Sequence, residues 1–138
     1  MDIDSVDSAI IEVLKENSRM SYVDIGKKVG LSEAAVRKRI KRLVDQGIIR
    51  RFTIEVKEDE AHAFTLVAVN PSTPTYEVSK NIRKIKGVKK VYEITGQYDI
   101  LSFVEGPTIS EVNNYVEEIR KTPGVLRTNT IIILREVE

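Results

Sequence analysis

A helix-ending signal and a helix-starting signal lie almost next to each other at residues 30–32, and this spacing constrains the fold most strongly. Gly30 is typical of the residue that ends a helix, and Ser32 is typical of the residue that caps the next one. Only Leu31 separates them. Two helices joined by a turn of about three residues form the helix-turn-helix arrangement. The sequence therefore predicts such a pair within residues 1–52.

Apolar residues recur with helical spacing on both sides of this turn. We expect a first helix capped by Asp4, a second opened by the capping box Ser21–Asp24, and a third that runs from Ser32 to about Gln46. The expected inner faces are Val6, Ile10, Val13 and Leu14; Tyr22, Ile25 and Val29; and Val36, Ile40, Leu43 and Val44. The β-rich stretch Ile48–Val56 follows, and we interpret it as a wing or a connecting strand.

Positive charge is concentrated in the predicted third helix and just after it. The net charge is only +1, but residues 1–52 carry 11 Lys and Arg against 8 Asp and Glu, whereas residues 53–138 carry 11 against 13. On a helical wheel, the side chains that point away from the apolar stripe around Ile40 are those of Ala34, Lys38, Lys41 and Arg42, with Arg37 and Arg39 flanking it. A face with one sign of charge at this two-helix spacing favours a polyanion-binding surface over a merely solvated one.

Residues 62–138 contain a degenerate internal repeat. The segment Glu77–Arg83 with the later pair Gly87-Val88 is similar to Glu111–Glu117 with the later pair Gly124-Val125. In both copies a helix ends near the Gly-Val pair, where a strand begins. Thr108 begins a capping box for the second of these helices.

A further strand precedes each helix, at His62–Val69 and at Ile100–Val104. The order is therefore β-α-β-β-α-β, the ferredoxin-like split pattern. The predicted fold class is α+β, with a (winged) helix-turn-helix domain at 1–52, a linker at 53–61 and a βαββαβ domain at 62–138. Because so small a domain has a small core, we expect it to oligomerise.

The composition excludes several classes of protein. The absence of cysteine excludes disulfide frameworks, zinc-thiolate sites and cysteine nucleophiles, and it fits a reducing cytoplasm. The apolar runs are too short for a membrane helix, and the N-terminus does not resemble a signal peptide. No paired carboxylates, nucleophile–base pair or phosphate-cradling glycine loop occurs. We therefore expect no catalysis, no cofactor, no metal and no membrane association.

Four motifs follow one another along the chain. They are Asp7…Ile10-Ile11…Leu14…Asn17-Ser18-Arg19; Leu31-Ser32…Val36–Leu43…Gly47-Ile48-Ile49; Gly96-Gln97-Tyr98-Asp99; and Pro123-Gly124-Val125 with Thr128 and Thr130. In this order and spacing the chain resembles the Lrp/AsnC (feast/famine) family of transcription regulators over nearly its whole length. The stretch between Phe52 and Phe64 departs from the family pattern, because it is short and lacks the Pro-x-x-Leu-Gly feature common there.

The resemblance implies a regulator that binds pseudopalindromic double-stranded DNA as a homodimer assembled through the βαββαβ domains, often further assembled into tetramers or octamers. Its implied base readers lie at the start of the third helix: Ser32, Glu33, Ala34, Arg37 and Lys38. Its implied contacts to the DNA backbone come from Lys41, Arg42, Arg50 and Arg51.

The resemblance also implies an amino-acid or related small-molecule effector, bound between subunits near the Gly-x-Tyr-Asp turn and the last strand. The candidate effector residues are Gly96, Gln97, Tyr98, Asp99, Thr128 and Thr130. The Asp99 carboxylate can pair with an ammonium group, and Gly96 permits close backbone approach. From the residues alone, Gly96–Asp99 is interpreted instead as an ordinary β-hairpin turn.

Three other functions stand as alternatives to an effector-modulated DNA-binding regulator. An RNA-binding sheet is disfavoured because only Phe64, Tyr92 and Phe103 supply aromatic rings on strands, and the basic cluster lies outside this domain. Some relatives of the family are sirohaem decarboxylases that use histidine and arginine, but the lone histidine here, His62, is interpreted as a polar residue at a strand edge. A DNA-binding regulator without an effector is the third alternative.

Overall fold

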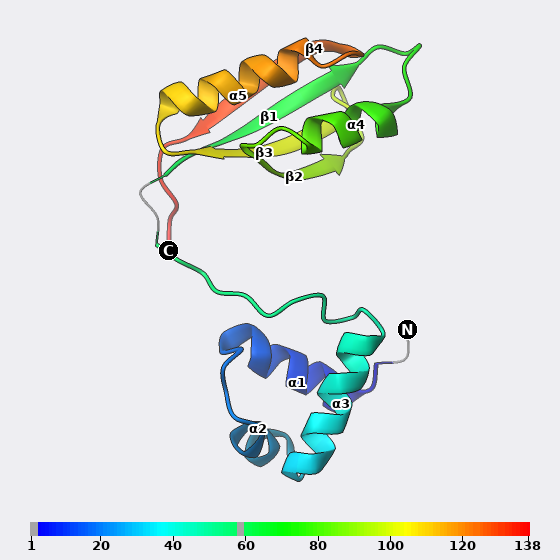
Figure 1. Ribbon diagram of the computed structural model, residues 1–138, viewed down its shortest axis with the longest axis vertical. Helices are drawn as coiled ribbons and strands as arrows, with labels where there is room; N and C mark the ends of the chain where they lie inside the picture. The colour runs from blue at the N-terminus through cyan, green and yellow to red at the C-terminus, as the bar shows by residue number, and fades with distance from the viewer. Residues whose placement is uncertain (1–2, 58–59) are drawn as a thin grey trace. The chain divides into compact units, whose positions relative to one another are not determined.

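The computed structural model describes residues 3–57 and 60–138 and divides the chain into two compact units, Met1–Lys57 and Glu58–Glu138. The N-terminal unit contains α1 (Ser5–Glu16), α2 (Tyr22–Val29) and α3 (Glu33–Asp45). The elements of the C-terminal unit are, in order, β1 (Ala61–Val69), α4 (Thr75–Arg83), β2 (Val88–Glu93), β3 (Ile100–Gly106), α5 (Ile109–Lys121) and β4 (Val125–Ile133). Figure 1 shows these elements along the chain. The predicted α+β class, helix-turn-helix followed by a βαββαβ unit, is confirmed.

Short polar side chains begin each helix of the N-terminal unit. Asp4 and Asp7 form a capping box, in which each carboxylate accepts a hydrogen bond from the backbone N–H of the other, at 2.7 and 3.4 Å. Ser21 and Ser32 accept bonds from the N–H groups three residues further on. Gly30 ends α2 with a φ of 76°, a left-handed conformation that glycine adopts without steric cost.

A small apolar core joins the three helices. Ile10, Ile25, Val36 and Ile40 form it, and Leu43 is also fully buried. The prediction that Val44 shares this inner face is wrong, because its side chain is 42% exposed. One residue advances a helix by about 100°, which carries Val44 from Leu43 to the margin of the covered face.

The stretch Ile48–Val56 is not a strand, so the expected wing or connecting strand is absent from the described part of the N-terminal unit. The N–H groups of Ile48 and Ile49 donate to the carbonyl of Leu43 in the last turn of α3. These bonds terminate the helix, and the chain after them has no regular secondary structure. A strand needs a neighbouring strand to pair its backbone, and none among the described residues pairs here. Ile48 and Ile49 are half-buried, but the side chains of Phe52, Ile54 and Val56 are exposed, with Ile54 at 73%.

The sheet of the C-terminal unit is antiparallel with strand order β2-β3-β1-β4. Residues directly opposite one another on neighbouring strands share a face. Helices α4 and α5 cover one face of the sheet (Figure 1). Ala63, Val67, Ile100 and Val104 lie on that face and form the main core with residues of both helices. We call the other side the open sheet face; its apolar residues are Phe64, Leu66, Tyr92, Leu101, Phe103 and Ile131.

Candidate DNA-binding face and ligand groove

The start of α3 presents the residues expected to read bases. The Ser32 hydroxyl is engaged in capping the helix, with the Ala35 N–H at 3.2 Å. Arg37 donates to Glu33 at 2.7 Å, and its guanidinium lies 5.1 Å from the centre of the Tyr22 ring on α2. Both charged side chains are more than half exposed, so this pair can separate at little free-energy cost when a phosphate or base approaches.

The outer side of α3 carries two lysines in different states. Lys41 donates to Asp45 at 2.8 Å, and this hydrogen bond raises the pKa of the Lys41 ammonium. Both partners are well exposed, which makes the pair weak. Lys38 makes no ion pair with any residue that the structure describes, and neither do Arg50 and Arg51 after the helix. These three side chains are free to contact DNA phosphates.

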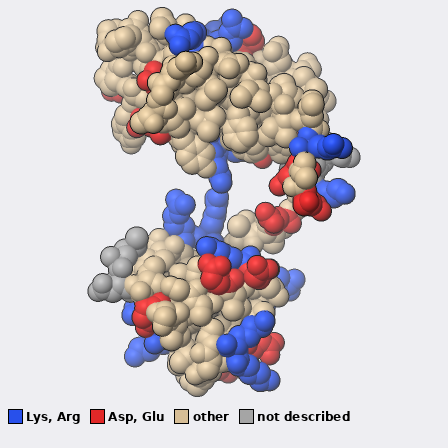
Figure 2. Space-filling view, turned by 180° about the vertical axis from the view of Figure 1, so that it is seen from behind, with Lys and Arg blue, Asp and Glu red and all other residues tan. Residues whose placement is uncertain are grey.

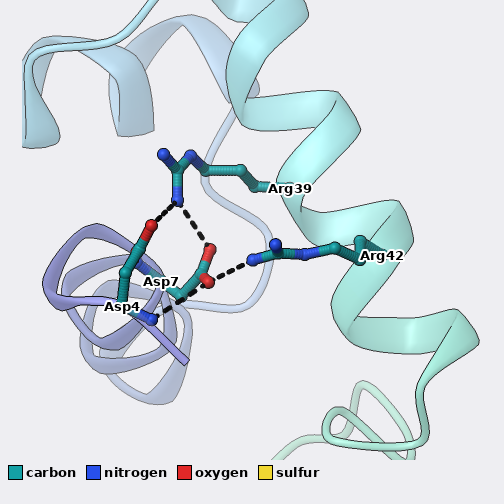
Figure 3. Close-up of polar contacts among 4 residues, drawn as sticks. All are labelled: Asp4, Asp7, Arg39 and Arg42. Carbon is teal, nitrogen blue, oxygen red and sulfur yellow. Dashed lines mark hydrogen bonds and ion pairs between the residues drawn. The ribbon is translucent and has the colours of Figure 1, made fainter. Parts of the chain in front are cut away.

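The inner edge of α3 faces α1 through an ionic cluster that the sequence did not predict (Figure 3). We call it the Asp7 cluster; its members are Asp4, Asp7, Arg39 and Arg42. Asp7 is fully buried and accepts from Arg39 at 3.0 Å through one oxygen and from Arg42 through the other. Arg39 also donates to Asp4 at 2.6 Å, and this bond lowers the pKa of the Asp4 carboxyl and raises that of the Arg39 guanidinium.

The Asp7 cluster shows that the basic side chains of residues 37–51 are not all unpaired. Arg42 was expected to face the DNA backbone, and the structure places part of its guanidinium on a buried carboxylate instead. A sequence signal for this existed, because Asp4 and Asp7 are three residues apart, as are Arg39 and Arg42. Such spacing puts each pair on one side of its helix. Figure 2 shows basic and acidic side chains interspersed over the N-terminal unit.

The candidate effector turn lies in the connection between β2 and β3, which is longer than a two-residue hairpin turn. Gly96 has a φ of 113°, in the range that favours glycine. One oxygen of Asp99 accepts from the Val69 N–H at 2.7 Å, so that carboxylate also secures the end of β1. Tyr98 lies beneath the guanidinium of Arg127 on β4, 5.4 Å from it, and Arg127 donates to the Gln97 carbonyl at 3.4 Å.

A groove of about 560 Å³ lies between α5 and β4. Thr128 and Thr130, both predicted effector residues, line it together with Arg127. The other lining residues are Asn113, Val116, Glu117, Arg120, Val125, Leu126 and Asn129. The hydroxyl oxygens of Thr130 and Thr65 are hydrogen-bonded at 3.1 Å. Sequence reasoning missed Arg127, which connects the groove to Gln97 and Tyr98; no spacing signal marked it, because the contact joins segments 30 residues apart.

The open sheet face has an aromatic centre. Phe103 lies between Phe64 and His62, with ring centres 5.2 and 5.6 Å away. His62 is the second residue of β1, which is an inner strand of the sheet. Its Nδ1 is buried without a hydrogen bond, 3.6 Å from a Glu105 carboxylate oxygen. Figure 2 shows a broad surface of the C-terminal unit that carries no charged side chain.

Two classes of site are absent from residues 3–57 and 60–138. No group of three or more histidine, cysteine or acidic side chains is placed to hold a metal ion. No helix in these ranges has the length and apolar character needed to cross a bilayer.

Comparison with known proteins assigns both units. The AsnC-type helix-turn-helix domain matches residues 3–44, and the Lrp/AsnC ligand binding domain matches residues 62–138. The HTH-type transcriptional regulator LysM of Sulfurisphaera tokodaii is 50% identical over 135 residues, which cover 97% of this chain and 96% of that one. The regulator of the same name from Saccharolobus solfataricus is 52% identical over 134 residues, covering 96% and 94%.

Among solved structures, the transcriptional regulator NMB0573 of Neisseria meningitidis in complex with L-Met has the same fold. Its TM-score is 0.87 over 99% of this chain and 93% of that one, at 24% sequence identity. Matches to both domain types, in order, and to regulators over nearly the full length leave one conclusion. This chain belongs to the Lrp/AsnC family of helix-turn-helix transcriptional regulators.

Proposed function

We propose that this regulator binds pseudopalindromic DNA as a homodimer, through α2 and α3, and that an amino acid modulates it. The observation that carries the DNA-binding part is the outer side of α3, where Lys38 is free and Lys41 is held only by an exposed, weak pair. Small Ala34 and Ala35 lie at the start of that helix, where a recognition helix approaches the major groove. Such a protein acts in the cytoplasm, where the chromosome lies.

A band-shift titration on the DNA upstream of the protein's own gene tests this. The Lys38→Ala/Lys41→Ala double variant should bind all duplexes more weakly and lower the salt dependence of log K by up to about 2. The double variant Lys86→Ala/Lys89→Ala removes the same charge from exposed positions of the C-terminal unit and should bind like the wild type. Equal losses in both variants would mean that α3 is not the DNA-binding face.

We propose that the open sheet face joins two copies of the chain. Its aromatic and aliphatic side chains form a continuous apolar surface on one side of the sheet, and such surfaces mark protein interfaces. A self-complementary sheet face gives a two-fold dimer, which matches the two-fold symmetry of a pseudopalindromic site. The exposed apolar side chains of the stretch after α3 support further contacts between copies.

We propose that the effector binds where the Gly96–Asp99 turn and the α5–β4 groove meet at Arg127. The Arg127 guanidinium suits an amino-acid carboxylate. Thr128 and Thr130 also line the groove, and their hydroxyls offer hydrogen bonds from the opposite side of β4, opposite Val67 and Thr65. One oxygen of Asp99 already holds the end of β1, which leaves the other for an ammonium group. The structural relative NMB0573, which was solved with L-Met, supports this ligand class.

Thermal unfolding in the presence of each of the twenty amino acids identifies the effector. A ligand at about 100 times its Kd stabilises the native state by about 2.7 kcal/mol. Arg127→Ala should abolish that shift, whereas Arg135→Ala, which removes an exposed arginine two residues after β4, should keep it. If no amino acid shifts the transition, the regulator works without an amino-acid effector.

We infer that the protein is not an enzyme. Its relatives are named as transcriptional regulators, and His62, the lone histidine, packs its ring against Phe103 on the open sheet face. Incubation of the purified protein with sirohaem tests the alternative. Release of carbon dioxide would contradict a purely regulatory role.

A further inference from the structure

Asp7 is the one fully buried acidic side chain among the described residues, and both its oxygens hold arginines of the recognition helix. Arg39 is the more covered of the two, with 29% of its side chain exposed, and it bridges Asp4 and Asp7. Arg42 is 44% exposed and reaches Asp7 through a single nitrogen, Nη2. The two arginines therefore differ. Arg39 links two acids within the N-terminal unit, whereas part of the Arg42 guanidinium remains exposed to solvent.

The exposed part of the Arg42 guanidinium carries unused hydrogen-bond donors. A guanidinium carries five N–H groups, and only those on Nη2 contact Asp7. Among residues 3–57 and 60–138, no hydrogen bond is donated from its Nε or Nη1. Arg42 follows Lys38 by one turn of α3, so the two side chains are neighbours on the helix surface. Arg42 thus lies at the edge of the outer side that carries Lys38.

Holding Arg42 on a buried carboxylate changes what a contact with DNA requires. A long exposed side chain loses rotamer freedom when it binds, and that loss opposes association. Arg37 and Lys41 are also paired, but their partners Glu33 and Asp45 are exposed, so those pairs are weak and order the two cations less. Arg42 has already been ordered by Asp7, so its free N–H groups can meet a phosphate oxygen without a change of partner.

We infer that Asp7 is a positioning residue for DNA binding: it fixes the Arg42 guanidinium so that the donors left free bind a DNA phosphate. This inference rests on the DNA binding proposed above. It also predicts the opposite change in DNA affinity from simple charge repulsion when Asp7 is replaced. Removing a negative charge near DNA should strengthen binding, whereas removing a positioning carboxylate should weaken it.

The test compares Asp7→Asn with Glu12→Gln, since both remove one acid from α1 and Glu12 is exposed in a pair with Lys15. Binding to a short duplex of mixed sequence is measured over a range of salt, because a phosphate contact does not depend on sequence. We expect Asp7→Asn to weaken binding on the order of tenfold, the value of one charge-assisted hydrogen bond. Glu12→Gln should bind as tightly as the wild type or slightly more tightly.

A double-mutant cycle separates positioning from a general effect on the fold. In an Arg42→Ala background, Asp7→Asn should cause no further loss of binding, whereas in an Arg39→Ala background it should still cause most of its loss. The circular dichroism of each variant shows whether it is folded. If Asp7→Asn does not fold, Arg42→Lys takes its place, because a lysine keeps the charge but lacks the rigid planar guanidinium that Asp7 holds in one orientation. That variant should then show the same tenfold loss.

Three results would overturn the inference and leave the proposed DNA binding intact. Tighter binding by Asp7→Asn would mean that Asp7 sequesters Arg42 from DNA. Equal losses in the Arg42→Ala and Arg39→Ala backgrounds would mean that Asp7 acts only on the stability of the unit. Wild-type affinity in Arg42→Lys would mean that the fixed guanidinium is not needed. Absence of DNA binding by the wild type would overturn the proposed function together with this inference.

Discussion

The two units of this regulator satisfy their buried polar groups in opposite ways. In the N-terminal unit the buried polar residue is an ionised acid, Asp7, which ties α1 to α3 through two arginines. In the C-terminal unit the buried polar residues of the sheet are Thr65 and Ser102, whose side chains end in hydroxyls. Ser102 donates to the Thr65 carbonyl at 2.9 Å, and the Thr65 and Thr130 hydroxyls pair at 3.1 Å.

The difference follows from what each fold leaves unsatisfied. Three short helices enclose a small core, so a charged tie between them adds stability and also orders side chains on the recognition helix. A four-stranded sheet satisfies its inner backbone groups by its own ladder, so hydroxyls suffice inside it. That sheet has helices on only one face, which leaves the apolar side chains of its other face uncovered within the chain.

The largest expected effect concerns that other face. Phe103→Asp places a charge at the centre of the open sheet face and should raise the Kd of the dimer by at least about 100-fold, or about 3 kcal/mol. Sedimentation equilibrium over a range of protein concentration measures this. Tyr76→Asp makes the same chemical change at an exposed position of α4 and should leave the dimer intact. A dimer that survives Phe103→Asp would show that the copies meet elsewhere.

The next effect concerns the charged tie. Asp7→Ala removes the buried carboxylate and leaves Arg39 and Arg42 without it, so we expect a loss of about 2 kcal/mol in the free energy of unfolding of the N-terminal unit. The two arginines can partly reach solvent, which limits the loss. Urea unfolding followed by helical circular dichroism measures it. Glu12→Ala, which breaks an exposed pair on the same helix, should change stability by less than about 0.5 kcal/mol.

A smaller effect is expected for the neutral network of the C-terminal unit. Ser102→Ala removes one hydrogen bond to the Thr65 carbonyl and should lower the free energy of unfolding by about 1 kcal/mol. Ser110→Ala, at an exposed position in the first turn of α5, is the matched control and should have little effect. If Ser102→Ala proves as harmful as Asp7→Ala, the contrast between charged and neutral buried groups does not hold.

The smallest effect is a pH dependence confined to the N-terminal unit. Arg39 holds the pKa of the Asp4 carboxyl below its usual value, so this carboxylate stabilises the folded unit above the unfolded-state pKa of about 3.9. That contribution should fade as the pH falls through the lower pKa of the folded state. Thermal unfolding between about pH 5 and pH 2 follows it. Arg39→Gln should flatten this part of the profile, and an unchanged slope would contradict the assignment.

Local patterns predicted most of the elements. Each helix of the N-terminal unit begins at a capping residue expected from the sequence, Asp4, Ser21 or Ser32, because such caps act over three residues. The internal repeat predicted the βαββαβ order, since a helix followed by a Gly-Val pair and a strand is also a local signal. The error at Ile48–Val56 has the opposite origin. Its composition favours a strand, but a strand exists only where another one pairs with it.

The candidate sites show the same difference between local signals and contacts of distant segments. The sequence alone determined which face of α3 is basic and outward, since a helical wheel needs only the periodicity of its own residues. It did not determine which of those cations are free. That depends on Asp7, 32 and 35 residues before Arg39 and Arg42. The effector candidates likewise came from motifs, whereas Arg127 joined them through contacts between distant segments.

The sequence by itself therefore determined the class, the order of elements and the family, because caps, periodicity and motif spacing are properties of neighbouring residues. Only the tertiary structure decided the state of the charges and the two faces of the sheet. Ion pairing depends on which side chains meet in space and on how far burial removes them from water. Register across strands decided that Phe64 and Phe103 lie opposite each other on an uncovered face, and no single strand contains that information.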